Sequence, residues 1–205
     1  KLAAIMSLAV LKSRALAGME APEVTVEVHL GRGLPSFTIV GLADTEVKEA
    51  RERVRAAIQN ARFEFPASRI TVNLAPADLP KESGRFDLPI ALGILAASGQ
   101  VSGKHLAEHE FAGELSLTGE LRTIRSALAM CLAARDAARS VVLPVGRAAE
   151  AALVGAATIL PAKSLLEVCA HLNGQQTLAP YADTPAVTAP DYPDLSDVKG
   201  QAQAR

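Results

Sequence analysis

Hydrophobic and polar residues alternate along the first half of the chain in the way that is typical of β-strands. Over Glu23–Leu30 every second residue is apolar, which predicts a half-buried strand. Short β-branched or apolar runs predict further strands at Leu8–Ser13, Ser36–Gly41 and Arg69–Leu74. Because residues 31–33 (Gly-Arg-Gly) make a turn, Ser36–Gly41 is expected to pair with Glu23–Leu30 as a hairpin.

Two stretches repeat apolar residues at the three- to four-residue spacing of a helix. The first begins at an N-cap supplied by Asp44 or Thr45 and ends by Arg62. The second, Leu88–Ala97, follows Asp87 as its predicted cap. This second helix is apolar nearly all round, so it is expected to be deeply buried.

The second half of the chain mixes short strands with helices. The predicted strands are Phe111–Leu117 with its return Gly119–Leu121, then Val141–Pro144 and Thr158–Leu160. The predicted helices are Ile124–Arg139, Ala148–Val154 and Ser164–Leu172. In the longest of these helices, Leu128 and Leu132 are expected to face the core. The order of elements predicts an α/β (α+β) fold in which helices pack on a mixed sheet.

The pattern changes after Gly174. Residues 175–193 are rich in proline and show no periodicity, which is typical of a linker. Residues 194–205 resume an ordered pattern, so the chain is expected to stop within the first turns of a further domain. Met6 resembles a native start, so residues 1–5 are interpreted as vector-derived and residues 6–174 as the main domain.

Composition places limits on partners and compartment. The formal net charge of the 205 residues is −1, so any contact with DNA would have to come from a local patch. The two cysteines, Cys131 and Cys169, lie in apolar helical patterns and are interpreted as buried thiols of a reducing compartment. No apolar run reaches the roughly 18 residues of a membrane span. These features predict a cytoplasmic protein without a membrane partner.

The sequence contains no phosphate-binding loop. In Gly103-Lys104-His105 a histidine replaces the Ser or Thr that would hold Mg²⁺, and the spacing back to Gly99 is one residue short. A Walker A motif is therefore missing from these residues, and no nucleotide or other cofactor is predicted for them.

Two histidines have a spacing that could serve a metal ion. His105 and His109 are four residues apart with Glu108 between them, but His29 and His171 are isolated in the sequence and supply no third ligand cluster. A solvated surface pair is the better interpretation, and no metal site is predicted.

The connection before the buried helix carries Lys81 and Ser83, close enough in sequence to raise a Ser-Lys catalytic dyad. The alternative is that Ser83-Gly84 turns the chain and Asp87 caps the helix. No second feature supports catalysis, so the structural interpretation is favoured.

The first helix is rich in charge of both signs. Its basic residues are Lys48, Arg51, Arg53, Arg55 and Arg62, and four acidic residues accompany them. An ion-paired, solvated face is the default interpretation. A nucleic-acid or subunit contact is the alternative, because the basic residues gather toward the C-terminal half.

Several long motifs occur in order and resemble one family. They are MSLAV (6–10), EVTVEVHL (23–30), VKEARERV (47–54), ITVNLAPADLPK (70–81), FDLPIA (86–91) and GELSLTGELR (113–122). On these motifs the chain is similar to the ComM (YifB) family of Mg-chelatase-like AAA+ ATPases.

The resemblance has implications for the fold and the parent protein. It implies that residues 6–174 form a Lon protease-like, ribosomal protein S5 domain 2-like domain, and that residues 194–205 begin an AAA+ domain. For the parent it implies ATP and Mg²⁺ in that motor. It further implies a homo-hexamer and DNA helicase activity that promotes branch migration in natural transformation.

The likeness to Lon also permits a test for peptidase residues. Laid without gaps on Pro80–Asp87, the position of the Lon serine falls on Arg85, two residues after Ser83. The position of the Lon lysine falls near Leu128, and no lysine occurs between His105 and Lys163. A Ser-Lys mechanism needs both groups within hydrogen-bond reach, so no peptidase activity is predicted.

The resemblance, together with the missing catalytic residues, implies a non-catalytic accessory domain that helps to assemble or orient a ring, and contact with DNA is a further hypothesis. The candidate phosphate-binding residues are Lys48, Arg51, Arg55, Lys81 and Arg85. The alternative is a structural, oligomerising domain without nucleic-acid contact. A chelatase-like role is a third possibility, although no metal-ligand motif supports it.

Overall fold

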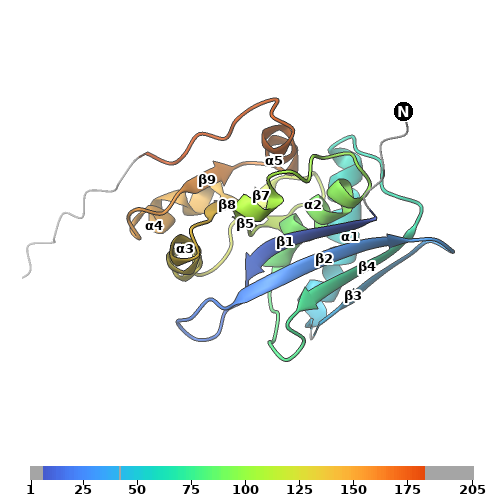
Figure 1. Cartoon of the computed structure of the whole chain (residues 1–205), viewed down its shortest axis with the longest axis horizontal. Coiled ribbons are helices and arrows are strands. Elements are labelled where there is room, and N and C mark those ends of the chain that lie inside the picture. The colour runs from blue at the N-terminus through green and yellow to red at the C-terminus, as the bar shows by residue number, and fades with distance from the viewer. Residues whose placement is uncertain (1–6, 42, 183–205) are drawn as a thin grey trace, which may run out of the picture.

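The computed structural model describes residues 7–41 and 43–182, and these form a mixed α/β fold with helices packed on a mixed sheet, as predicted (Figure 1). The main sheet has seven strands in the order β3-β4-β2-β1-β5-β8-β9, and β6 and β7 form a separate pair. The strands are β1 (Leu8–Arg14), β2 (Glu23–Gly31), β3 (Ser36–Val40), β4 (Arg69–Ala75), β5 (His109–Phe111), β6 (Glu114–Leu115), β7 (Leu121–Arg122), β8 (Ser140–Pro144) and β9 (Ile159–Ala162). The helices are α1 (Thr45–Asn60), α2 (Asp87–Ala97), α3 (Ala127–Asp136), α4 (Ala148–Ala152) and α5 (Leu165–Leu172), with short 3₁₀ turns η1 (Gly84–Phe86), η2 (Leu106–Glu108) and η3 (Val145–Arg147).

The predicted hairpin between β2 and β3 is wrong. Strand β4 lies between them, antiparallel to β2 and parallel to β3, so that Val72 is opposite both Val28 and Ile39. The link over residues 32–35 is longer than the two-residue turn of a tight hairpin. Helix α1 then carries the chain from β3 back to a parallel β4, as a β-α-β crossover requires.

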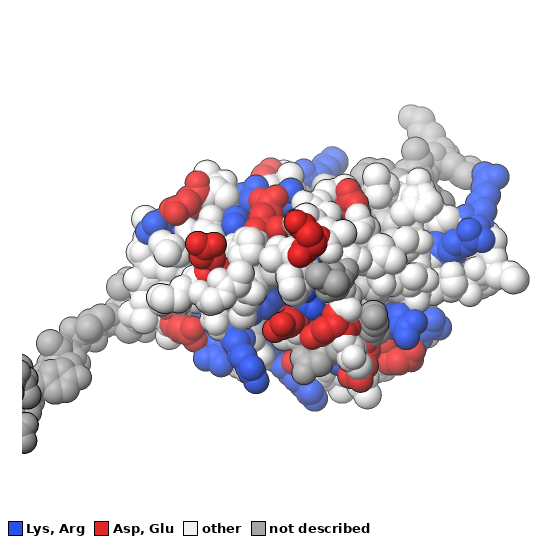
Figure 2. Space-filling model, turned by 90° about the horizontal axis from the view of Figure 1, so that it is seen from below, with Lys and Arg blue, Asp and Glu red and all other residues white. Residues whose placement is uncertain are grey.

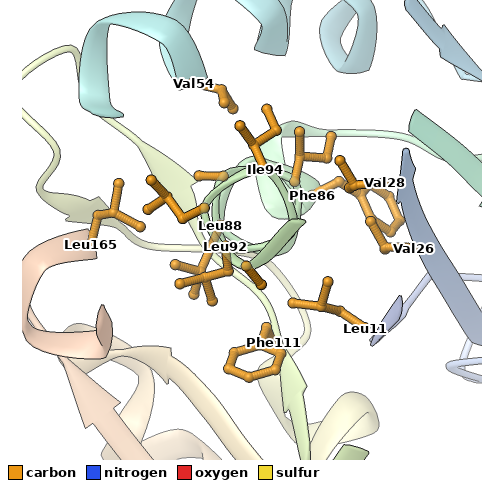
Figure 3. Close-up of a cluster of buried hydrophobic side chains, with 14 of the residues drawn as sticks. Leu11, Val26, Val28, Val54, Phe86, Leu88, Leu92, Ile94, Phe111 and Leu165 are labelled. Atoms are coloured by element: carbon orange, nitrogen blue, oxygen red, sulfur yellow. The ribbon is translucent and has the colours of Figure 1, made fainter. Parts of the chain in front are cut away.

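Helix α2 forms the centre of the larger core (Figure 3). All of its residues are buried, as its apolar sequence predicted, and it packs against β1, β2 and α1. Gly93 permits close contact with the sheet, because a Cβ atom there would lie 2.4 Å from Val28 Cγ2. The valines of β2 that were expected to face inward are fully buried in the same cluster.

The second half of the sheet is covered on both faces. Val142 and Leu160 point into the larger core beneath α2 and α5, whereas Val141, Leu143 and Ile159 point into a smaller core beneath α3 and α4. By contrast, the side chains of β1, β2 and β4 that point away from α1 and α2 are half-buried or exposed, except for Arg14 at the end of β1, which is buried.

The predicted inward face of α3 is wrong. Leu128 and Leu132 are exposed, by 41% and 47%, and the buried residues are Ala127, Met130, Cys131 and Ala134. The helix starts at Ala127 rather than Ile124. Its small side chains pack closely on β8, and the larger leucines lie on the opposite side.

One predicted N-cap is confirmed and one is wrong. The Asp44 carboxylate accepts the Val47 N–H at 2.8 Å at the start of α1. Ser164, predicted as the first residue of the last helix, is instead the N-cap of α5 and accepts the Glu167 N–H at 3.3 Å. Asp87 is the first residue of α2 rather than its cap, and its carboxylate is bonded elsewhere.

The described part of the predicted linker packs on the domain. The N–H of Leu178 donates to His171 Nδ1 at 3.2 Å, and that of Tyr181 to the Ile159 carbonyl at 2.9 Å. The interpreted vector residues 1–5, the rest of the linker and the expected domain start at 194–205 lie outside the described residues. None of the described helices is long and apolar enough to cross a membrane.

Candidate functional site

Two of the five candidate phosphate-binding residues lie together on the surface of α1. Arg51 and Arg55 are both exposed, one helical turn apart. Arg51 donates to the Phe37 carbonyl at 3.5 Å, and the guanidinium carbon of Arg55 lies 4.5 Å from the centre of the Phe65 ring. The Phe37 and Phe65 rings are 6.0 Å apart. One arginine therefore lies over an aromatic ring, and the other bonds to the main chain of β3 at the edge of the sheet.

The third candidate on α1, Lys48, belongs to the same helix, but its side chain lies outside the described part of the structure. Acidic side chains are interspersed with basic ones on the face shown in Figure 2, so that face carries no uniformly basic surface. The mixed charge agrees with the net charge of −1 for the whole sequence.

The other two candidates are buried. Lys81 is fully buried, its amine donates to the Pro76 carbonyl, and burial lowers its pKa. Arg85 is 1% exposed, and burial lowers its pKa to about 10. Neither side chain lies on the exposed surface that carries Arg51 and Arg55, so the structure separates these two candidates from the α1 pair.

Lys81 and Ser83, the residues of the hypothetical dyad, have different partners. The hydroxyl oxygen of Ser83 lies 3.4 Å from Arg85 Nε, whereas the amine of Lys81 is bonded to Pro76. Among the described residues no hydrogen bond joins Lys81 to Ser83. Ser83 also has a positive φ of 70°, which is uncommon for a residue other than glycine.

A cleft of about 370 Å³ opens beside this connection. Its walls come from the start of α1, the segment before α2, strand β6 and the segment between β7 and α3. The lining residues are Asp44, Glu82, Ser83, Gly84, Arg85, Glu114, Thr123, Ile124 and Arg125.

The described residues also include a partly buried ion pair that sequence analysis missed. Arg53 donates to both Asp87 oxygens, at 2.7 and 3.1 Å, and the Leu115 N–H donates to the same carboxylate at 3.1 Å. Burial raises the pKa of Asp87 to about 6, and the Arg53 guanidinium opposes this shift. The pair ties α1, α2 and β6 together across 34 residues of sequence, so no local signal predicted it.

A second buried network joins the two halves of the sheet. Glu110 accepts from Arg14 Nε and Nη2 at 2.8 and 2.6 Å, and from Arg139 Nε at 3.0 Å. Arg139 also bonds to Glu23. Its members come from β1, β2, β5 and the segment after α3, and this separation in sequence explains why it was missed.

The structure corrects the interpretation of the histidines. His105 forms an exposed pair with Glu108 at 2.8 Å, but His109 is 8% exposed and not a surface residue. The ring of His171, isolated in sequence, lies 5.4 Å from that of His109. Within residues 7–41 and 43–182 no group of three or more His, Cys, Asp or Glu could hold a metal ion.

Both cysteines are free and buried, as predicted. Burial raises the pKa of each thiol to about 12. Since the thiolate is the reactive form, neither thiol is suited to nucleophilic chemistry.

Comparison with known proteins shows the family. Residues 26–147 match the family described as "Subunit ChlI of Mg-chelatase". The chain is 49% identical over 205 residues to "Competence protein ComM" of Haemophilus influenzae and 48% identical over 200 residues to "Uncharacterized protein YifB" of Escherichia coli. The chain belongs to the ComM/YifB family of Mg-chelatase-like proteins.

The match extends along nearly all of this chain and less than half of each relative. It covers 98% of the chain and 40% of the Haemophilus and Escherichia proteins. An "Uncharacterized protein" of Mycobacterium tuberculosis is 37% identical over 194 residues, which are 94% of this chain and 39% of that protein. The chain therefore spans about two fifths of the length of the relatives that it matches.

Proposed function

We propose that this domain is the non-catalytic accessory part of a ComM-like protein that acts on DNA during natural transformation. The observation that carries the proposal is 49% identity, over nearly the whole chain, to a protein named for competence. In this proposal the parent is a cytoplasmic, hexameric AAA+ helicase that promotes branch migration. ATP and Mg²⁺ then belong to the motor, and this domain helps to assemble or orient the ring.

The domain itself has no peptidase role in this proposal. Lys81 and Ser83 are bonded to different groups, and the buried amine of Lys81 donates to a main-chain carbonyl. A general base has to lie within hydrogen-bond reach of its nucleophile.

DNA contact is proposed to occur through the α1 surface. Arg51 and Arg55 are exposed, and the ring of Phe65 beside Arg55 offers an aromatic edge to nucleotides. Lys48 extends this basic helix in sequence. Lys81 and Arg85 are buried away from this surface and take no part in the proposed contact. Phosphate contacts of this kind release counterions, so binding is expected to weaken steeply with salt.

The test is a titration of single-stranded and forked DNA with the full-length protein at two salt concentrations. Arg51→Glu with Arg55→Glu is expected to weaken binding at low salt and to flatten the salt slope by roughly 2, about 0.9 for each lost phosphate contact. Arg122→Glu with Lys163→Glu makes the same change of charge at adjacent exposed sites on another surface. This control is expected to keep the parental slope, and equal losses in both variants would contradict a specific α1 contact.

The second candidate function is oligomerisation without nucleic-acid contact. It is favoured by a groove of about 310 Å³ between α3 and the β1–β2 turn. Leu132 and Met19 line this groove, and Met19 is 95% exposed. Sedimentation of Leu132→Glu and DNA titration of Arg51→Glu with Arg55→Glu, both in the full-length protein, separate the candidates. Loss of assembly in the first variant with unchanged DNA affinity in the second would favour this one.

A further inference from the structure

Arg85 is a buried cation without a buried anion. Its three nitrogens donate only to neutral groups: Nη2 to the Arg125 carbonyl at 2.7 Å, Nη1 to the Arg14 carbonyl at 3.4 Å and Nε to the Ser83 hydroxyl at 3.4 Å. Two of these contacts are long for a hydrogen bond. Among the described residues no carboxylate pairs with Arg85.

The other buried arginine, unlike Arg85, has a carboxylate partner. Arg14 is 7% exposed, and its guanidinium forms a two-pronged pair with Glu110. A buried charge is expected to be paired, because removing it from water without a counter-charge is strongly unfavourable. Burial is the sole cause of the lowered pKa of Arg85, so no neighbouring carboxylate offsets the penalty.

Arg85 is one of the residues that line the cleft described above. Ser83 and Arg125, which accept from Nε and Nη2, line that cleft with Arg85 itself. The volume of about 370 Å³ is within the range of small-molecule sites. A guanidinium in this position can offer parallel N–H groups to a planar carboxylate.

The rest of the lining is acidic. Asp44, Glu82 and Glu114 belong to the same walls. Asp44 is engaged as the α1 cap and Glu114 lies 3.4 Å from Arg122, whereas Glu82 is exposed. Such walls disfavour a polyanion like DNA and favour a positive group on the ligand.

We propose that the cleft binds a small zwitterionic ligand of the peptide or amino-acid class, whose carboxylate pairs with Arg85. The positive group of the ligand lies toward Glu82. This site is independent of the proposed DNA surface, because Arg51 and Arg55 do not line the cleft. Failure of either proposal leaves the other standing.

The test is an amide NMR titration of the 205-residue chain with glycylglycine, glycylglycinamide, acetate and inorganic phosphate. Glycylglycine is expected to shift the Ser83, Gly84 and Arg125 signals, and glycylglycinamide, which lacks the carboxylate, to bind at least ten-fold more weakly. Arg85→Gln is expected to weaken glycylglycine binding at least ten-fold. Equal binding of the acid and the amide, or no shift of cleft signals, would overturn the proposal.

A second variant keeps the test decisive if Arg85→Gln does not fold. Glu82 is exposed, so Glu82→Gln should fold normally. It is expected to weaken glycylglycine roughly three-fold and to strengthen acetate, because it removes an attraction for the ammonium and a repulsion of the anion. Affinity changes of the same sign for both ligands would overturn the zwitterion assignment. Phosphate binding more tightly than glycylglycine would overturn the choice of a carboxylate.

Discussion

Burial changes the roles that single charged residues can have in this domain. Lys81, Arg85 and Asp87 stand close together in a motif that, as sequence, suggested phosphate ligands and a helix cap. In the structure all three are buried, and each has a shifted pKa because of that burial. A sequence states the charge of a side chain, but its solvation depends on residues distant along the chain.

Asp87 gives a prediction about pH. Burial raises its folded pKa to about 6, above the roughly 4 of an unfolded aspartate. The folded state then binds the proton more tightly, so this group makes stability fall as pH rises from about 4 to about 6, by on the order of 3 kcal/mol. Asp87→Asn is expected to remove this slope in urea unfolding measured across that range.

The control for Asp87 is Glu82→Gln, which changes an exposed carboxyl nearby. It should keep the parental dependence on pH. A parental stability that rises through pH 4 to 6 because of Asp87 would show that pairing with Arg53 outweighs burial, and would contradict the prediction.

At the scale of elements, local patterns predicted which segments are helices and strands but not how they pair. The alternation in β2 predicted a strand buried on one face, and the all-apolar sequence of α2 predicted a helix buried on every side. The position of β4 between β2 and β3 could not be predicted from such patterns, because it depends on a crossover through α1. The buried face of α3 was predicted wrongly, because that face consists largely of small residues and the larger leucines are exposed.

Gly93 tests the close packing of α2 on the sheet. In most helices Gly→Ala is stabilising by about 1 kcal/mol. Here the new Cβ would lie 2.4 Å from Val28 Cγ2 and 3.1 Å from Leu11 Cδ1, so Gly93→Ala is expected to lower the free energy of unfolding by about 1–3 kcal/mol. Urea unfolding measures the change.

A double-mutant cycle supplies the control for Gly93. Val28→Ala removes the methyl group nearest to the new Cβ and leaves only contacts of 3.1 Å, so Gly93→Ala in that background is expected to be much less destabilising than in the parental protein. Stabilisation of the parental background would show that α2 can move away from the sheet, against the prediction.

Across the whole molecule, the two halves of the sheet meet where β1 runs parallel to β5, at Lys12 opposite Glu110. The buried network of Glu110 with Arg14 and Arg139 lies at this junction. The first half is covered by helices on one face and the second half on both. The network therefore links two parts of the domain that have different surroundings.

Glu110→Gln is the substitution that tests this junction. The glutamine keeps the shape but leaves the guanidinium of Arg14, 9% exposed, without a counter-charge. Breaking a buried pair in this way is expected to lower the free energy of unfolding by about 3–5 kcal/mol. Glu23→Gln removes a partly exposed carboxylate from the same network and is expected to cost less than about 1 kcal/mol. Urea unfolding gives both values, and amide hydrogen exchange reports whether β5, β8 and β9 open before β1, β2 and β4. Equal, small effects of the two substitutions would mean that apolar packing alone joins the halves.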